Sequence, residues 1–272
     1  MNLCVIIAAA GSSARYLAAG AVRHKLEEDL GGKIVLQRTI EAFTKHDAVR
    51  SIIIAGPNDP ELLSAFKLRH GDKMGLLGAK IIQGGQSHRY ESIAAALTHV
   101  PADATHIAVH DAARPCISSE LLDRLVEMAT LHAAVIPAIA CPDTVKRVKQ
   151  TDEPAFPNDD PVAAILGDAP RSKEKLRVVT ETLDRTLLVL VQTPQIFEAG
   201  LLRRAYAQKD LTSTDDAALV ERLGEKVAIC QGDVRNIKIT TPDDLIMARA
   251  AMGFRGDGGG GGGDQRSAMK RF

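Results

Sequence analysis

Short runs of apolar, often β-branched residues alternate along this chain with segments in which apolar residues recur at helical spacing. Segment 34–46 is an example, because Ile34, Leu36, Ile40 and Phe43 would share one face of a helix. Such alternation is typical of a mostly parallel sheet with crossover helices. The predicted strands are residues 3–9, 51–55, 80–82, 107–110 and 133–139, and the predicted helices are 34–46, one that begins at 61, 90–99 and 121–130.

The pattern changes after residue 140. Residues 144–149 and 177–182 alternate polar and apolar positions, which predicts two strands that could pair as an antiparallel arm. The segment between them, 151–175, is rich in Pro and Asp and is predicted to be a surface insertion. Regular structure returns with predicted strands at 187–192, 227–230 and 237–240 and predicted helices at 198–208, 215–223 and 242–252.

A glycine tract, residues 258–263, precedes a short polar and basic end of the chain. Such a composition cannot bury enough apolar surface to order itself, so residues 254–272 are predicted to be a disordered tail. We expect a single domain over residues 1–253, with the arm and insertion at about 142–186.

Composition narrows the classes of function. Of 272 residues, 45% are hydrophobic, and 34 basic residues balance 34 acidic ones, so no overall positive field favours nucleic acid as a partner. Aromatic residues make up only 3%, which disfavours base-stacking platforms. The four cysteines are far apart, as expected of reduced thiols, and no apolar run reaches membrane-spanning length. We therefore expect a soluble, cytoplasmic protein that binds neither nucleic acid nor a membrane.

Five small residues form a turn at the end of the first predicted strand. These residues are Ala9, Ala10, Gly11, Ser12 and Ser13. Such a turn lets backbone N–H groups face a phosphate, and the cations Arg15 and Lys25 could neutralise the charge that accumulates during nucleotidyl transfer. The turn lacks the Gly-Lys-Ser/Thr ending of a P-loop and the three glycines of a dinucleotide fold. An ordinary strand-to-helix connection is therefore an equal interpretation of this turn alone.

Polar residues also follow the fourth predicted strand, in the string His110-Asp111-Ala112-Ala113-Arg114-Pro115. Ligands of open α/β sheets bind beyond the carboxyl ends of strands. The carboxylate of Asp111 could hold a metal or a substrate hydroxyl, and Arg114 could reach a phosphate. Alternatively, the two side chains form an ion pair that only fixes the loop. The histidine has no paired nucleophile in the sequence and is predicted to be structural.

Further candidate contacts lie in three other segments. The glycine turn Gly84-Gly85-Gln86, with Ser92 in the following helix, could approach a planar base, or it could simply cap that helix. Thr144 and Arg185 flank the insertion and would suit a phosphate monoester, although exposed strand residues look the same. Thr193 lies in the string Gln192-Thr193-Pro194-Gln195, and Lys238 lies in Asn236-Ile237-Lys238-Ile239-Thr240. Of the two, Lys238 is the better candidate to contact an anion.

In this order, the segments resemble the 2-C-methyl-D-erythritol 4-phosphate cytidylyltransferases, the cytidylyl-transferring enzymes of the non-mevalonate isoprenoid pathway. The turn with Arg15 is shared with many nucleotidyltransferases. The strings His-Asp-Ala-Ala-Arg-Pro, Asp-Thr-Val-Lys-Arg, Gln-Thr-Pro-Gln and Asn-Ile-Lys-Ile-Thr are far more specific in this succession. The resemblance covers about residues 3–252 and implies a three-layer Rossmann-like nucleotidyltransferase with a mostly parallel sheet and an extended β-arm for dimerisation.

The resemblance also implies roles for individual residues. Arg15 and Lys25 would stabilise the transition state at the α-phosphorus of CTP, and Arg185 and Lys238 would position the methylerythritol phosphate. The implied CTP contacts are Ala9, Ala10, Gly11, Ser12, Ser13, Gly84, Gly85, Gln86, Ser92, Asp111 and Ala112. The implied substrate contacts are Asp111, Arg114, Thr144, Arg185, Thr193 and Lys238.

The implied assembly is a homodimer in which the arm completes the partner's site. The implied cofactor is Mg²⁺, held mainly by the triphosphate oxygens rather than by protein ligands. Because the attacking phosphate is already a nucleophile, catalysis would reduce to in-line positioning and charge neutralisation.

The chain departs from the family pattern at His24-Lys25, where Pro-Lys is usual, and its loop from Arg15 to the lysine is about three residues longer. Arg23 is therefore an alternative to Lys25 at the α-phosphate. The glycine turn before Ser92 is one residue longer as well. Two other functions stay open: a ribitol 5-phosphate cytidylyltransferase, which Ala113, Lys146 and Arg147 disfavour, and a nucleotide-binding regulatory module without turnover.

Overall fold

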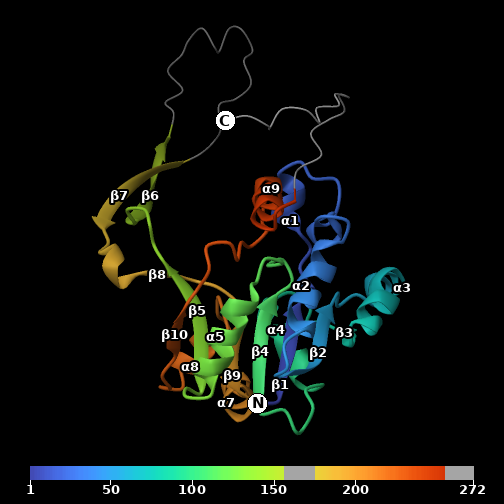
Figure 1. Cartoon of the computed structure of the whole chain (residues 1–272). Helices are drawn as coiled ribbons and strands as arrows, with labels where there is room; N and C mark the ends of the chain where they lie inside the picture. Colours follow the sequence, from blue (N-terminus) through green and yellow to red (C-terminus); the bar gives the residue numbers. More distant parts are fainter. Residues whose placement is uncertain (156–174, 255–272) are drawn as a thin grey trace, which may run out of the picture. The chain divides into compact units, whose positions relative to one another are not determined.

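The computed structural model describes residues 1–155 and 175–254 (Figure 1). The chain divides into two compact units, one made of Met1–Ala138 and the chain from Val191 onward, the other of Ile139–Leu190. Most of the predicted insertion and of the predicted tail lies outside the described residues.

The first unit is built around a mixed sheet in which β1 (Leu3–Ala8) lies between β2 (Val49–Gly56) and β4 (His106–Asp111), parallel to both. The sheet order is β10-β5-β9-β4-β1-β2-β3. The remaining strands of this order are β3 (Ala79–Gln83), β5 (Ala134–Ala140), β9 (Gln195–Glu198) and β10 (Ala228–Gln231). The carboxyl ends of the central parallel strands therefore meet at one edge of the sheet, where ligands bind in open α/β folds.

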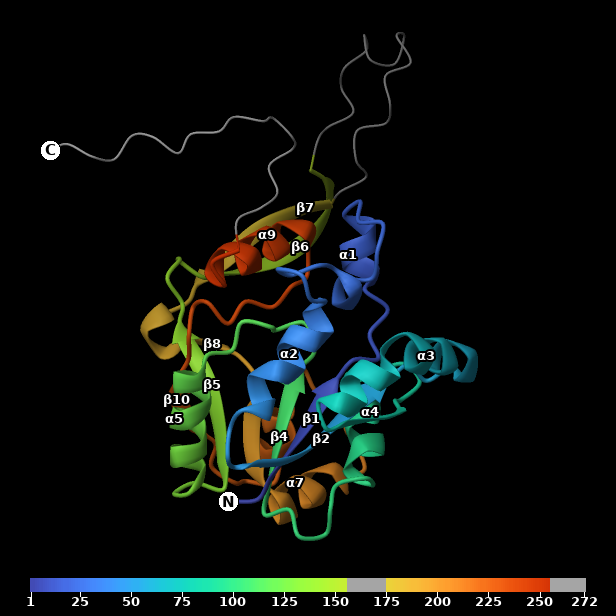
Figure 2. The same cartoon turned by 45° about the vertical axis from the view of Figure 1, so that its right-hand side comes forward.

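Helices cover both faces of this sheet (Figure 2). On one face α2 (Val35–Thr44), α3 (Pro60–Leu76), α5 (Ser119–Ala129) and α9 (Pro242–Ala251) pack over one core. On the other face α4 (Arg89–Leu97), α7 (Ala199–Tyr206) and α8 (Ala217–Glu221) pack over a second core. Two short helices follow β1, α1 (Ala14–Ala18) and the 3₁₀ helix η1 (Lys25–Glu27). This is the expected three-layer α/β architecture.

The alternation of side chains along a strand produces the two cores. In β1, Leu3, Val5 and Ile7 belong to the first core, whereas Cys4 and Ile6 belong to the second. All five are fully buried, and each apolar side chain of this size contributes about 1.5–3 kcal/mol by leaving water. A continuous apolar run is thus the expected sequence of a central strand covered on both faces.

Three sequence predictions are corrected. Residues 237–240 are not a strand: the N–H of Ile239 donates to the Ala113 carbonyl (2.8 Å), so this segment follows the loop after β4 instead of a sheet edge. Residues 187–192 contain only the three-residue strand β8 (Val189–Val191), because a 3₁₀ turn, η2 (Arg185–Leu187), occupies the start. Finally, β9 is a strand that the sequence reading missed, and it pairs antiparallel with β4 and β5.

The second unit contains the predicted antiparallel pair, β6 (Lys146–Pro154) with β7 (Lys175–Thr182). β6 continues to Pro154, so the start of the predicted insertion is a strand. Val148 pairs with Val179 across the two strands, and both side chains are about half exposed. This unit therefore presents an apolar cross-strand pair to its surroundings.

Candidate active site

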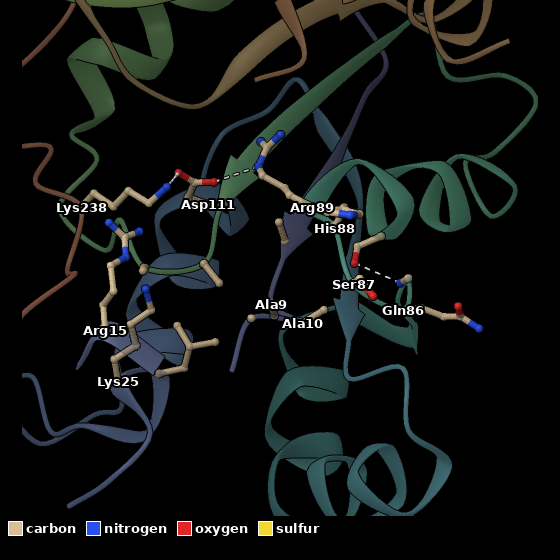
Figure 3. A pocket seen from close by; sticks show the side chains of 17 residues that line it. Ala9, Ala10, Arg15, Lys25, Gln86, Ser87, His88, Arg89, Asp111 and Lys238 are labelled. Atoms are coloured by element: carbon tan, nitrogen blue, oxygen red, sulfur yellow. Dashed lines mark hydrogen bonds and ion pairs between the residues drawn. The ribbon is translucent and has the colours of Figure 1, made fainter. Parts of the chain in front are cut away.

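A cavity of about 320 Å³ lies at the carboxyl ends of β1 and β4 (Figure 3). Arg15, Lys25 and Lys238 lie on one side of it, and residues 86–89 lie on the other. The lining contains eleven residues that the sequence analysis selected: Ala9, Ala10, Gly11, Arg15, Lys25, Gly85, Gln86, Ser92, Asp111, Ala112 and Lys238. The structure thus brings together segments that are more than 200 positions apart in the chain.

The turn after β1 ends at Ser13, whose φ of 58° is left-handed. Serine rarely adopts this conformation, which here ends the turn and starts α1. Arg15 comes shortly afterwards and lines the cavity, whereas Ser13 is buried and is not among the lining residues. Ser12 lines a neighbouring hollow of about 470 Å³ that shares the turn as a wall.

Lys25 begins η1 and lines the cavity, whereas Arg23 is exposed and does not. The Lys25 Nζ donates to the Ile239 carbonyl (3.0 Å), which ties it to the 236–241 segment. Burial, and then the charges of Lys238 and Arg15, lower the pKa of Lys25. An anion bound at this site would stabilise the charged form of Lys25, because its negative charge would offset the unfavourable effects of burial and of the other cations.

Asp111 ends β4 and carries the negative charge of the cavity. Its carboxylate pairs with the Lys238 Nζ at 2.8 Å, the Arg89 Nε at 3.2 Å and the Arg114 Nε at 3.6 Å. Burial alone would raise the pKa of Asp111, but the charges of Arg89 and Lys238 hold it well below its usual range. The carboxylate is therefore ionised, and it fixes the positions of three cations.

Arg89 is a charged lining residue that the sequence analysis missed. It starts α4, and its Nη1 pairs with the buried carboxylate of Asp216 at 2.7 Å, while the hydroxyl of Tyr206 donates to the other oxygen of Asp216 (2.5 Å). Its position three residues after the glycine turn was a usable signal, because the backbone N–H groups of such turns can form anion-binding sites. Nothing in the sequence shows that it links two aspartates as far apart in the chain as residues 111 and 216.

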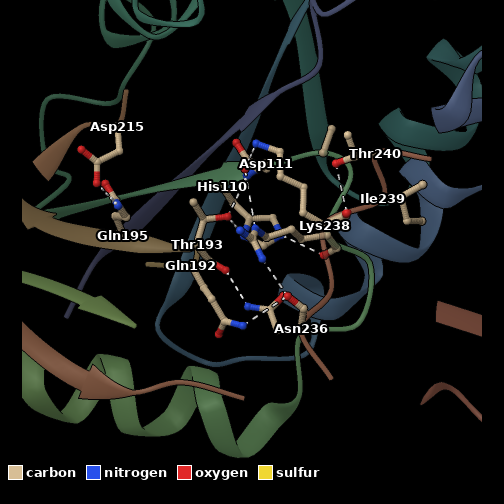
Figure 4. A network of polar contacts seen from close by, with 12 residues as sticks. His110, Asp111, Gln192, Thr193, Gln195, Asp215, Asn236, Lys238, Ile239 and Thr240 are labelled. Carbon is tan, nitrogen blue, oxygen red and sulfur yellow. Dashed lines mark hydrogen bonds and ion pairs between the residues drawn. The ribbon is translucent and has the colours of Figure 1, made fainter. Parts of the chain in front are cut away.

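A buried polar network lies beneath Asp111 (Figure 4). The Thr193 hydroxyl lies 3.1 Å from His110 Nδ1 and accepts a hydrogen bond from the Asp111 N–H (3.1 Å), while His110 Nε2 lies 3.0 Å from the Arg114 carbonyl. The Asn236 Nδ2 donates to the Thr193 carbonyl (2.8 Å). Burial lowers the pKa of His110 to about 4, so the imidazole is neutral. These contacts make His110 structural, as expected, and place Thr193 under the cavity wall.

Close backbone packing explains the two glycines before α4. A Cβ on Gly84 would lie 2.3 Å from the Gly56 carbonyl oxygen, and one on Gly85 would lie 2.1 Å from the Glu91 Cβ. The Ser92 hydroxyl accepts the N–H of Gly85 (3.0 Å) and thereby fixes the turn from below. The Gln86 side chain points away from Lys238 and Arg15.

The other candidates lie elsewhere. Gly84, Arg114 and Thr193 lie behind the cavity wall, where Arg114 also donates to the Asn236 carbonyl (2.7 Å). Thr144 and Arg185 belong to the second unit, where the Arg185 guanidinium donates to the Pro142 carbonyl. Their contact with a substrate stays a prediction.

Comparison with known proteins identifies the family. The family model described as IspD, 2-C-methyl-D-erythritol 4-phosphate cytidylyltransferase, matches residues 3–154 and 160–253. The chain belongs to this family. It is a CTP-dependent cytidylyltransferase of isoprenoid biosynthesis.

Individual relatives agree over nearly full length. The chain is 34% identical to 2-C-methyl-D-erythritol 4-phosphate cytidylyltransferase of Alkaliphilus metalliredigens over 260 residues, which are 94% of this chain and 95% of the relative. It is 37% identical to that of Rhodococcus jostii over 246 residues, 90% and 92% of the two chains. The crystal structure of the Thermus thermophilus enzyme is similar with a TM-score of 0.64 and 30% identity, covering 93% of this chain and 100% of that one.

Two further observations concern the described residues, 1–155 and 175–254. None of their helices combines the length and the hydropathy needed to span a membrane. They also contain no group of three or more His, Cys, Asp or Glu side chains that could hold a metal ion.

Proposed function

We propose that the cavity at the ends of β1 and β4 is where CMP passes from CTP to the phosphate of 2-C-methyl-D-erythritol 4-phosphate, with release of pyrophosphate. The observation that carries this proposal is the convergence of Arg15, Lys25 and Lys238 on one cavity that also contains a single ionised carboxylate, Asp111. The family sets the reaction, and the arrangement of charges supports this place for it.

The chemistry needs charge neutralisation more than proton transfer. The attacking group is a phosphate oxygen that is already anionic, so no general base is required. Negative charge grows on the oxygens around the α-phosphorus as the new bond forms and the pyrophosphate departs. Arg15 and Lys25 follow the small-residue turn and line the cavity, so with CTP bound there they would stabilise the transition state electrostatically.

Asp111 and Lys238 would bind other parts of the two substrates. Lys238 is held by Asp111 at 2.8 Å and still has 40% of its side chain exposed, so it can bind a second phosphate while it keeps its ion pair. Asp111 would face the ribose and the polyol hydroxyls, because a carboxylate accepts hydrogen bonds from both. The Gly85 turn would lie against the cytosine. Only glycine fits there, because a Cβ would lie 2.1 Å from the Glu91 Cβ.

A magnesium ion fits this site if the nucleotide supplies most of its ligands. Asp111 is the single carboxylate among the residues that line the cavity, and three cations already engage it. Mg²⁺ commonly keeps several waters and binds through one or two carboxylates and substrate phosphates. Bound in that way, it would screen the triphosphate charge, and Asp111 is the protein group that could reach it.

We also propose that the protein acts as a homodimer in which Thr144 and Arg185 of the second unit contact the polyol phosphate of the partner's site. The exposed apolar side chains of the second unit support an interface: they include Val148, Val179, Leu187 and Leu190. Sedimentation at several concentrations tests the assembly. Mixing an Arg185→Ala variant with a Lys25→Met variant tests the sharing, because mixed dimers would regain one intact site.

The function is tested by pyrophosphate release from CTP and Mg²⁺ with either methylerythritol phosphate or ribitol 5-phosphate. Release with the first substrate and little with the second is the expected result. Release with ribitol phosphate alone would overturn the substrate assignment, and release with neither would favour the regulatory module. Full activity in a Lys25→Met variant would refute the assigned location of the site.

A further inference from the structure

One histidine outside the predicted site connects its two halves. The His24 Nε2 lies 2.8 Å from the Gly11 carbonyl oxygen, across 13 positions of sequence, and the His24 Nδ1 accepts the N–H of Leu26 at 3.3 Å. Gly11 belongs to the turn that lines the cavity, and Leu26 lies within η1, directly after Lys25. A single side chain therefore bonds both the turn and the lysine loop.

The two partners fix the form of the imidazole. The Gly11 carbonyl can only accept a hydrogen bond and the Leu26 N–H can only donate one. In this arrangement the His24 Nε2 donates its proton to the Gly11 carbonyl and the Nδ1 accepts the Leu26 N–H.

The loop between the turn and Lys25 has few other anchors. Residues 17–20 are exposed, as are Val22 (96%) and Arg23, so Tyr16 is the buried side chain between Ser13 and His24. A Cβ on Gly11 would meet nothing within 4 Å, so side-chain packing does not hold the turn at this point. A longer loop has more conformations to lose before Lys25 reaches the cavity, and a bond across its base removes many of them.

We propose that His24 is a positioning residue for nucleotidyl transfer: its Nε2–H bond to Gly11 holds Lys25 at the correct distance from the turn that carries the triphosphate. The inference rests on the proposed role of Lys25 at the α-phosphate. The bond to Leu26 has a different effect, because it caps η1 locally and would stabilise this helix wherever the turn lay.

The two bonds can be separated by substitution. In His24→Gln, the side-chain amide nitrogen can reach the place of Nε2 and keep the bond to Gly11. In His24→Asn, the side-chain oxygen takes the place of Nδ1 and keeps the bond to Leu26, but nothing reaches Gly11. A matched control is His46→Asn. The His46 Nδ1 likewise accepts the N–H of the residue two positions on, Ala48 (3.1 Å), but His46 has no bond to the turn after β1.

The experiment measures pyrophosphate release by the full chain at saturating CTP, Mg²⁺ and methylerythritol phosphate. We expect kcat to fall by about 10- to 100-fold in His24→Asn, since misplacing a catalytic group by about 1 Å can cost 100-fold. KM for methylerythritol phosphate should stay unchanged. His24→Gln should stay within about threefold of the wild type, and His46→Asn should match it.

A double-mutant cycle shows whether the effect passes through Lys25. In a Lys25→Ala background, His24→Asn should cause no further loss, because the group that it positions is already gone. Three results would overturn the inference: an active His24→Asn, a His24→Gln as impaired as His24→Asn, or losses that multiply in the cycle. These three results count against the inference only if the wild type releases pyrophosphate. A wild type that releases none would instead refute the proposed function.

Discussion

Replacing Asp111 by Asn removes one charge and leaves the shape of the side chain almost unchanged. Asp111 is 8% exposed and lies within 3.6 Å of three cations, so the variant loses the counterion of a buried cluster. Breaking a buried ion pair by removing one partner costs about 3–5 kcal/mol. Arg89 keeps its second partner, Asp216, and Lys238 is partly exposed. We therefore expect about 3 kcal/mol, near the lower end of that range.

Urea unfolding measures this loss. With about 2–3 kcal/mol per molar of urea for a chain of this size, the midpoint should fall by about 1 M. The matched control is Asp123→Asn, because Asp123 is 66% exposed and pairs with His46 at 3.2 Å. A surface pair of this kind contributes about 0–1 kcal/mol, so its midpoint should barely move.

The pH dependence provides an independent check. The cations lower the pKa of Asp111 in the folded chain below its value of about 3.9 in the unfolded chain. The carboxylate therefore stabilises the fold fully above the unfolded value, and this contribution is lost as the pH falls towards the folded one. The difference between wild type and Asp111→Asn should be largest at pH 7 and should narrow towards pH 3. Equal midpoints at pH 7, or a difference that does not change with pH, would refute the electrostatic reasoning.

Three further outcomes are expected. Lys25→Met should lower kcat for pyrophosphate release by about 100- to 1,000-fold with an unchanged urea midpoint, as for loss of one oxyanion-hole donor; a smaller loss than 10-fold would contradict its role. Gly85→Ala should weaken CTP binding in calorimetry by 10-fold or more, because the new Cβ meets Glu91 at 2.1 Å, and unchanged affinity would show that the turn can shift freely. Tyr206→Phe should lower the free energy of unfolding by about 1.5–3 kcal/mol, since it removes a donor from the buried carboxylate of Asp216, and an unchanged midpoint would contradict this.

Local sequence was sufficient for the neighbouring parallel strands β4, β1 and β2 and for the turns at their ends. The run from Leu3 to Ile7 predicts a strand covered on both faces, since every one of its side chains is apolar. Asp111 was expected at a site because it directly follows such a strand. These features depend on residues that are neighbours in the chain, so side-chain periodicity and turn chemistry reveal them.

Contacts between distant segments were decided only by the tertiary structure. β9 enters the sheet antiparallel between β4 and β5, and residues 237–240 bond to the loop after β4 instead of forming a strand. The ion pairs that join Arg89 to Asp111 and Asp216, and the bond from His24 to Gly11, also connect positions that are well separated in sequence. A sequence shows which side chains can form such bonds, but the choice among partners is made by the packing that brings their atoms within about 3 Å.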